Sequence, residues 1–234
     1  MWILAKTKHS KASQTSFLIF NALKLIIKTR VEPLIFIFHR FFTHSFFFYN
    51  LKRSIYKDTV GSSLKWADYQ MRPNFLLALC LAPQMINKEH ARLALKQVKR
   101  FLMNDPHSLG IKTLDESDMN YCGVYDNAND STERRIAHGF NYHQGPEWLW
   151  PVGYYLRCLL LYASETTSEK EETISLVKQH LGKLSACLSL NEWKSLPELT
   201  NKNGEECTFS CSSQAWSLAT IVEVFYDLAE MNVE

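Results

Sequence analysis

Apolar residues recur at helical spacing in several stretches of the chain after residue 56, and polar segments rich in Gly, Pro and Asn separate these stretches. One stripe follows Asn87, a residue type that caps helix N-termini, and a shorter helix is predicted from Pro73 to Leu81. The residues at helical spacing are Ala91, Leu95, Val98 and Leu102; Leu149, Val152, Leu156 and Leu159; Ile174, Val177, Leu181, Leu184 and Leu188; and Ala215, Leu218, Ala219, Val222, Phe225, Tyr226 and Ala229. No convincing run of alternating strand residues appears, so the pattern predicts an all-α chain.

The first fifty or so residues follow another pattern, with basic side chains scattered through apolar runs. Lys24, Lys28 and Arg30 interrupt the first run and Arg40 the second, whereas a membrane-spanning helix needs about 20 mostly apolar residues. No small-residue cleavage site of a signal peptide follows cleanly before Lys24. We therefore interpret residues 1–52 as a leader outside the domain, such as a gene-model artefact, and residues 53–234 as the domain.

Two long loops, at about 105–145 and 190–211, carry most of the unusual chemistry, and loops of this length are usually functional. Aromatic residues make up 13% of the chain, and many of them lie beside Asn, Gln, Asp or Glu. Sugar sites need such a mixture, because pyranose faces stack on rings while hydroxyls bind polar groups. An aromatic-rich helical core is the simpler alternative.

Other function classes find little support in the chain. A net charge of +2 is too small to attract nucleic acid. The spacing of His138 and His143 matches no standard zinc pattern. No phosphate-binding loop or Ser or Cys nucleophile motif is present. The six cysteines lack paired CxxC spacing, so we expect reduced thiols and a cytoplasmic protein.

Four segments, read together, resemble a known family. They are Asp68–Phe75; Lys112–Asp115 with Tyr121–Asn127; Gly139-Phe-Asn-Tyr-His-Gln-Gly-Pro-Glu-Trp-Leu-Trp-Pro151; and Leu196–Asn201 with Ser210–Trp216. In order and content they resemble the C-terminal part of the amylo-1,6-glucosidase domain of eukaryotic glycogen debranching enzymes, over about residues 53–228. The resemblance implies a partial (α/α)6 barrel, a six-hairpin glycosidase toroid, and hydrolysis of α-1,6-linked glucose with inversion. It also implies a glycogen limit dextrin as substrate and no metal or organic cofactor.

The resemblance also implies the roles of individual residues. Glu198, in Pro-Glu-Leu-Thr-Asn, matches the general base, while the Arg-Asp segment that carries the family's general acid has no match in this chain. The chain would then be inactive without the missing N-terminal half of the domain. The expected sugar contacts are Tyr69, Gln70, Arg72, Asn74, His143, Gln144, Glu147 and Trp148.

These assignments leave alternatives open. Glu147 could simply stabilise the first turn of a helix, and Arg72 could form a structural ion pair. We expect Glu147 and Glu198 to come from loops at the same end of the helices. The chain could instead be a non-enzymatic glycogen- or partner-binding helical module, or a small membrane-associated helical protein.

Overall fold

The computed structural model describes residues 49–164 and 166–231, and five α-helices dominate this part of the chain. Their bounds are α3 Phe75–Leu81, α4 Lys88–Gln97, α5 Trp150–Leu161, α6 Thr167–Leu190 and α7 Ala215–Met231. Short 3-10 turns lie at Lys65–Tyr69, Pro83–Met85, Ala137–Gly139 and Lys202–Gly204. The predicted helical class is confirmed: each of the four expected stripes forms a helix, and the shorter predicted helix forms as α3.

The helix after Asn87 begins as its sequence predicts. The Asn87 side chain accepts a hydrogen bond from the backbone N–H of His90 at 3.0 Å, which satisfies one of the unpaired donors of the first turn. The helix continues past Gln97 as a π-helical turn, Val98–Leu102, so the predicted stripe is continuous through Leu102.

Helix α5 lies at the centre of the core and contacts the other four α-helices. Its most extensive packing is against α7, where Gly153 lets the two backbones approach closely at Thr220. At the edge of the same interface, Arg157 donates to Asp227 and Glu223. The sequence places glycine where the two helices cross because no larger side chain would fit there.

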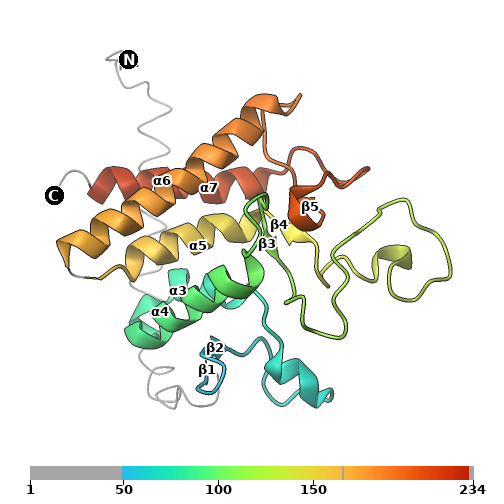
Figure 1. Cartoon of the computed structure of the whole chain (residues 1–234), viewed down its shortest axis with the longest axis horizontal. Helices are drawn as coiled ribbons and strands as arrows, with labels where there is room; N and C mark the ends of the chain where they lie inside the picture. Colours follow the sequence, from blue (N-terminus) through green and yellow to red (C-terminus); the bar gives the residue numbers. More distant parts are fainter. Residues whose placement is uncertain (1–48, 165, 232–234) are drawn as a thin grey trace, which may run out of the picture. The chain divides into compact units, whose positions relative to one another are not determined.

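Five short strands, which the sequence pattern does not predict, accompany the helices. Tyr49–Asn50 (β1) pairs with Ile55–Tyr56 (β2), and an antiparallel sheet contains Ile111–Lys112 (β3), Glu147–Trp148 (β4) and Leu199–Thr200 (β5) in that order. Figure 1 shows this sheet beside the end of the helical core where α5 and α7 begin. It ties both long loops to that end of the helices.

The leader expected at 1–52 lies almost wholly outside the described residues. Among the described residues, no helix has both the length and the apolar character needed to cross a membrane.

Candidate functional site

Glu198 lies directly before β5, and both of its backbone polar groups are hydrogen-bonded. Its N–H donates to the carbonyl oxygen of Cys211 at 2.8 Å, and its carbonyl oxygen accepts from Leu149 N–H at 3.1 Å. The side chain is half-buried, and its Oε1 accepts from Nε2 of Gln214 at 2.8 Å. The carboxylate is therefore oriented from the residue that precedes α7 and retains an exposed surface.

Tyr142 is the second group that contacts this carboxylate. Its hydroxyl hydrogen-bonds to Glu198, and burial together with the nearby negative charge raises the pKa of Tyr142. A tyrosine held in its protonated form can donate its hydroxyl hydrogen to the carboxylate. Two donors from different loops, Tyr142 and Gln214, thus converge on Glu198.

His143 and Trp148 form the aromatic wall beside Tyr142. The His143 and Trp148 rings stack with centroids 4.9 Å apart, and the Trp148 indole N–H donates to the Tyr142 carbonyl oxygen at 3.0 Å. Burial and the neighbouring Arg72 lower the pKa of His143, while Glu198 opposes this shift. Trp148 is almost entirely buried, whereas His143 keeps an exposed edge.

Arg72 connects the segment after Tyr69 to this wall. Its guanidinium donates to the carbonyl oxygens of Thr113 and His143 at 3.2 and 2.6 Å, and to the side-chain oxygens of Gln70 and Gln144 at 3.0 and 2.8 Å. Burial lowers the pKa of Arg72, and the charges of Asp58 and Asp118 counteract part of that effect. Arg72 therefore fixes the backbone and amide positions around residues 143–144.

Tyr69 and Asn74 lie at the edge of this arrangement. Asn74 donates to Asp58 at 2.7 Å, and the backbone oxygen of Tyr69 accepts from Arg53, while the Tyr69 side chain is exposed. These contacts do not connect either side chain to the groups around Glu198. The structure thus unites Gln70, Arg72, His143, Gln144 and Trp148 with Glu198, but not these two.

Glu147 has a different environment from Glu198, although their strands are neighbours. Its side chain has no exposed surface. Oε1 accepts from the Ser108 hydroxyl at 2.7 Å and the Asn203 N–H at 3.0 Å, and Oε2 accepts from the Thr200 hydroxyl and the Gly204 N–H, each at 3.2 Å. Burial raises the pKa of Glu147, although the four hydrogen bonds act to lower it. With both oxygens held by protein donors, the carboxylate presents no surface to a ligand in this structure.

The register of the sheet relates the two glutamates. Glu147 pairs with Thr200 and Trp148 with Leu199, and Glu198 lies next to this pairing, directly before β5. Both carboxylates therefore lie at the same end of the helices, where they were expected.

Trp150 and Trp216 form a further part of this region. Their rings stack with centroids 4.3 Å apart and an interplanar angle of 6°, across the first turns of α5 and α7. The sequence analysis identified neither Tyr142 nor Gln214 as a contact of Glu198. Position alone, beside His143, was the signal that could have identified Tyr142.

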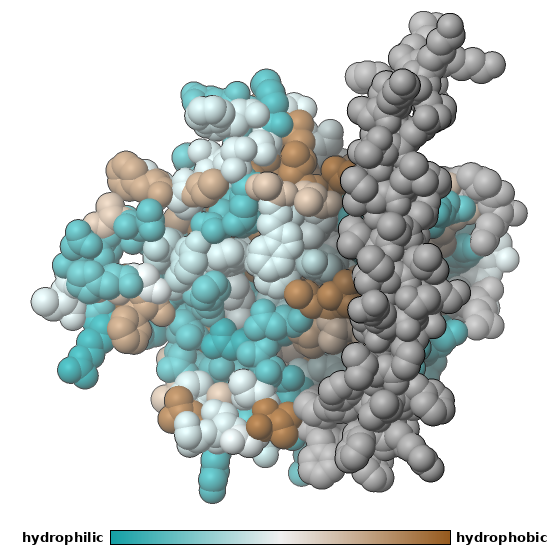
Figure 2. Space-filling model, turned by 180° about the vertical axis from the view of Figure 1, so that it is seen from behind, coloured by the Kyte–Doolittle hydropathy of each residue, from teal (hydrophilic) through white to brown (hydrophobic). Residues whose placement is uncertain are grey.

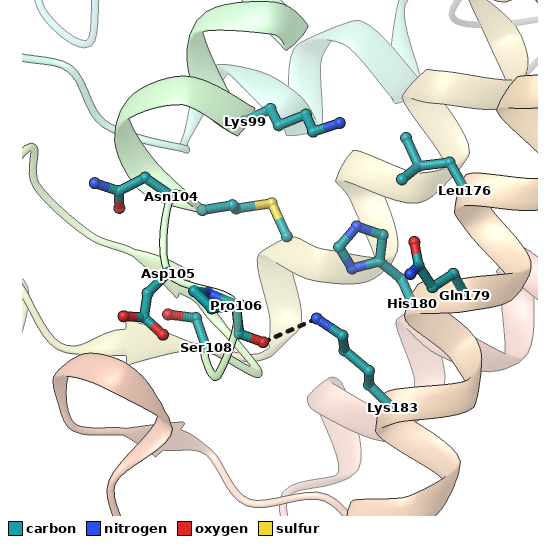
Figure 3. A pocket seen from close by; sticks show the side chains of 10 residues that line it. Lys99, Asn104, Asp105, Pro106, Ser108, Leu176, Gln179, His180 and Lys183 are labelled. Carbon is teal, nitrogen blue, oxygen red and sulfur yellow. Dashed lines mark hydrogen bonds between the residues drawn. The ribbon is translucent and has the colours of Figure 1, made fainter.

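Two cavities lie near this end of the molecule. One is a cleft of about 990 Å³ between the turn at Pro106–Leu109, the last turns of α6 and the loop that contains Trp193 and Phe209. The other, of about 230 Å³, lies between Lys99 and Ser108 on one side and α6 on the other. Figure 3 shows His180 and Lys183 of α6 facing this smaller pocket, with Lys183 bonded to the Pro106 carbonyl oxygen at 2.9 Å.

The residues considered for a metal do not converge. His138 lies 3.6 Å from the carboxylate of Asp130, away from the ring of His143, which stacks on Trp148. Within the described part of the chain, no group of three or more His, Cys, Asp or Glu residues could hold a metal ion.

The described residues thus form a mostly helical unit whose loops bring a carboxylate, hydrogen-bond donors and aromatic rings to one end. The family model described as amylo-alpha-1,6-glucosidase matches residues 26–223, and the chain belongs to this family. The matched range begins inside the segment 1–52 that we interpreted as a leader.

Among curated proteins, the chain is similar to the glycogen debranching enzyme of Saccharomyces cerevisiae (strain ATCC 204508 / S288c). The two are 39% identical over 186 residues, which is 76% of this chain and 12% of that enzyme. The chain therefore spans about an eighth of the length of this relative.

Proposed function

We propose that this chain forms the C-terminal part of an (α/α)6 glucosidase barrel and supplies its general base, Glu198. The substrate is an α-1,6-linked glucose at a branch point of a glycogen limit dextrin. The observation that carries the proposal is the Glu198 carboxylate, half-buried and held by Gln214 and Tyr142 at the loop end of the helices. We place this activity in the cytoplasm.

The chemistry requires two carboxyl groups. An inverting glycosidase protonates the leaving oxygen with one of them and activates water with the other, about 6.5–9.5 Å away. Gln214 and Tyr142 hold the Glu198 carboxylate in a position from which it can take a proton from water. The general acid is assigned to the upstream half of the domain, and no organic cofactor or metal takes part in the proposal.

The side chains around Glu198 divide into two groups. His143 and Gln144 have exposed surface next to the carboxylate and are proposed to bind sugar hydroxyls. Gln70, Arg72 and Trp148 are mostly buried and position that wall. Glu147 holds the β3–β4–β5 sheet to the loop at Asn203–Gly204, and Tyr69 and Asn74 are proposed as outer contacts.

Glucose release from a limit dextrin tests the assignment of Glu198. In the enzyme that joins this chain to the preceding half of the domain, Glu198→Gln should lower the rate by about 10² to 10⁴-fold, because the general base is lost. Glu206→Gln, in an exposed part of the same loop region, is the matched control and should leave the rate unchanged.

The chain alone should release no glucose above the level of its own Glu198→Gln variant. Release by the isolated chain that Glu198→Gln abolishes would show that the chain contains its own general acid and would contradict the proposal.

The cleft of about 990 Å³ favours a second candidate function, a glycogen-binding module. Two exposed rings, Trp193 at 70% and Phe209 at 72%, lie at this cleft, where Asn191 joins their loops by donating to the Ser212 carbonyl oxygen at 3.1 Å. Exposed rings on fixed loops can stack on sugar faces.

If this function holds, Trp193→Ala should weaken retardation of the chain in glycogen-containing native gels, while Trp66→Ala should not. Equal retardation of both variants would contradict it.

A further inference from the structure

Two cysteines from distant parts of the sequence meet in the helical core. Cys80 lies near the end of α3 and Cys158 in the second half of α5, and their Sγ atoms are 3.2 Å apart. A disulfide bond has a length of about 2.05 Å, so the sulfurs need to approach by roughly 1 Å to be joined. Adjustment of the two side-chain torsions can supply such a movement, since both helices already pack against each other.

The structure contains the reduced pair. Cys80 Sγ donates to the carbonyl oxygen of Tyr154 at 3.4 Å, and Cys158 Sγ donates to that of Leu76 at 3.6 Å. Each thiol is thus directed at the backbone of the opposite helix, which holds the two sulfurs face to face. All six cysteines of the chain are free thiols, and Cys80 with Cys158 is the pair whose sulfurs are in contact among those described.

Solvent reaches one member of the pair. Cys80 is half-buried and lines a pocket of about 430 Å³ together with Arg157, Leu161 and Met231. Cys158 is fully buried. Burial and the proximity of Cys80 raise the pKa of Cys158, and because Cys80 lines the pocket, Cys80 is the member that an oxidant in solution can reach.

We propose that Cys80 and Cys158 are a modification site that forms an intramolecular disulfide with a small-molecule disulfide such as oxidised glutathione. The Cys80 thiolate attacks one sulfur of the oxidant, releases one small thiol and forms a mixed disulfide. The Cys158 sulfur then attacks the Cys80 sulfur, and the second small molecule leaves as a thiolate that takes up the proton of Cys158 to become a thiol. Two protein thiols are oxidised and one small disulfide is reduced to two thiols, so atoms and electrons balance.

The bond would close a loop between positions that are 78 residues apart in sequence. That loop contains β3, β4 and the residues from Arg92 to Trp148, including His143. Crosslinking a long loop reduces the freedom of the unfolded chain more than that of the folded chain, so the oxidised form should be the more stable one. The pair would make the packing of α3 on α5 sensitive to the thiol–disulfide balance.

Differential alkylation of the full chain tests the site. The protein is reduced, equilibrated with oxidised glutathione, alkylated and digested, and the peptides are sequenced by mass spectrometry. We expect a linked pair of peptides containing Cys80 and Cys158, a mass lower by two hydrogen atoms, and alkylation at the other four cysteines. The melting temperature should rise by several degrees on oxidation.

Variants separate this site from general oxidation. Cys80→Ser should abolish the linked peptides and the rise in melting temperature, whereas Cys187→Ser, at a half-buried cysteine of α6, should preserve both. Cys158→Ser should also abolish the link, and since this buried position can affect folding, the wild-type peptide map stands as the primary measurement. Full alkylation of Cys80 and Cys158 after oxidation, or a link between another pair, would overturn the proposal.

Discussion

Two glutamates from neighbouring strands show how burial and hydrogen bonding define a residue's role. Glu147 is fully buried and accepts four hydrogen bonds from Ser108, Thr200, Asn203 and Gly204. Glu198 keeps exposed surface and accepts from side chains that fix only part of the carboxylate. The first is therefore suited to holding loops together and the second to proton transfer. The sequence placed both in loops, whereas Glu147 lies in β4, and it did not show which of the two is solvent-accessible.

The structural role of Glu147 predicts a stability effect. Glu147→Gln replaces one of the two acceptor oxygens with an NH2 group that cannot accept from a backbone N–H or a hydroxyl, so two of the buried donors lose their partner. We expect the free energy of unfolding to fall by about 1–3 kcal/mol. Chemical denaturation should show this loss, and Glu206→Gln, at an exposed glutamate, should show almost none. Equal stability of the two variants would mean that the four bonds contribute little.

His143 predicts a dependence of stability on pH. Its pKa is lowered in the folded chain from the ordinary value of 6.5, by burial and by Arg72. Between the lowered value and 6.5, the unfolded chain binds more protons than the folded one, so stability falls as the pH decreases through this window and is recovered above 6.5. His143→Gln should have a flatter profile of unfolding free energy between about pH 5 and 7. Parallel profiles for wild type and variant would contradict this explanation.

At the scale of elements, helices were predictable and strands were not. Asn87 and the stripe from Ala91 to Leu102 gave the start and the buried face of α4, because both signals are local. β3, β4 and β5 have two residues each, and their pairs are distant in sequence: Ile111 and Trp148 are 37 positions apart, and Trp148 and Leu199 are 51 apart. No alternation can show in two residues, and pairing between distant segments leaves no local trace.

The same limit applied to the site. The resemblance identified Glu198 and the segment around His143, but the donors Tyr142 and Gln214 become neighbours of Glu198 only through the folding of two separate loops. Arg72 was selected from its polar surroundings, and the structure shows it bonded to both His143 and Gln144. Tertiary contacts of this kind cannot be recognised from the spacing of residues along the sequence.

Two glycines in helices predict opposite effects of the same substitution. A Cβ at Gly153 would lie 2.4 Å from the Cβ of Thr220, so Gly153→Ala should separate α5 from α7 and destabilise the protein by about 1–3 kcal/mol. Gly182 is exposed on α6 with nothing within 4 Å of the added atom, so Gly182→Ala should stabilise by about 0.5–1 kcal/mol. Thermal unfolding measures both. If Gly182→Ala destabilised the protein as much as Gly153→Ala, close packing of α5 on α7 would not explain the effect at Gly153.

At the scale of the whole molecule, apolar groups remain on the surface of the described chain. Figure 2 shows them on one face as separate groups between polar residues. Helix α7 contributes exposed Val222, Phe225 and Tyr226, although its opposite side buries Ile221 and Val224 against the core. A helix that is apolar on both sides is typical of an element buried between two layers, and a toroid of two helical rings contains such elements.

This surface predicts that the chain self-associates when it is expressed alone. About 25 cal/mol is gained per Å² of apolar surface removed from water, so a few hundred Å² on α7 correspond to several kcal/mol, comparable with the stability of a domain. We expect light scattering after size exclusion to show oligomers or aggregates of residues 53–234, and a monomer once the chain is joined to the preceding half of the glucosidase domain. The double change Val222→Gln and Phe225→Gln should lower the association, whereas Met119→Gln, at a residue that is 84% exposed in a loop, should not. A monomeric chain with one cooperative unfolding transition would instead show a self-sufficient fold and favour the glycogen-binding module over the glucosidase fragment.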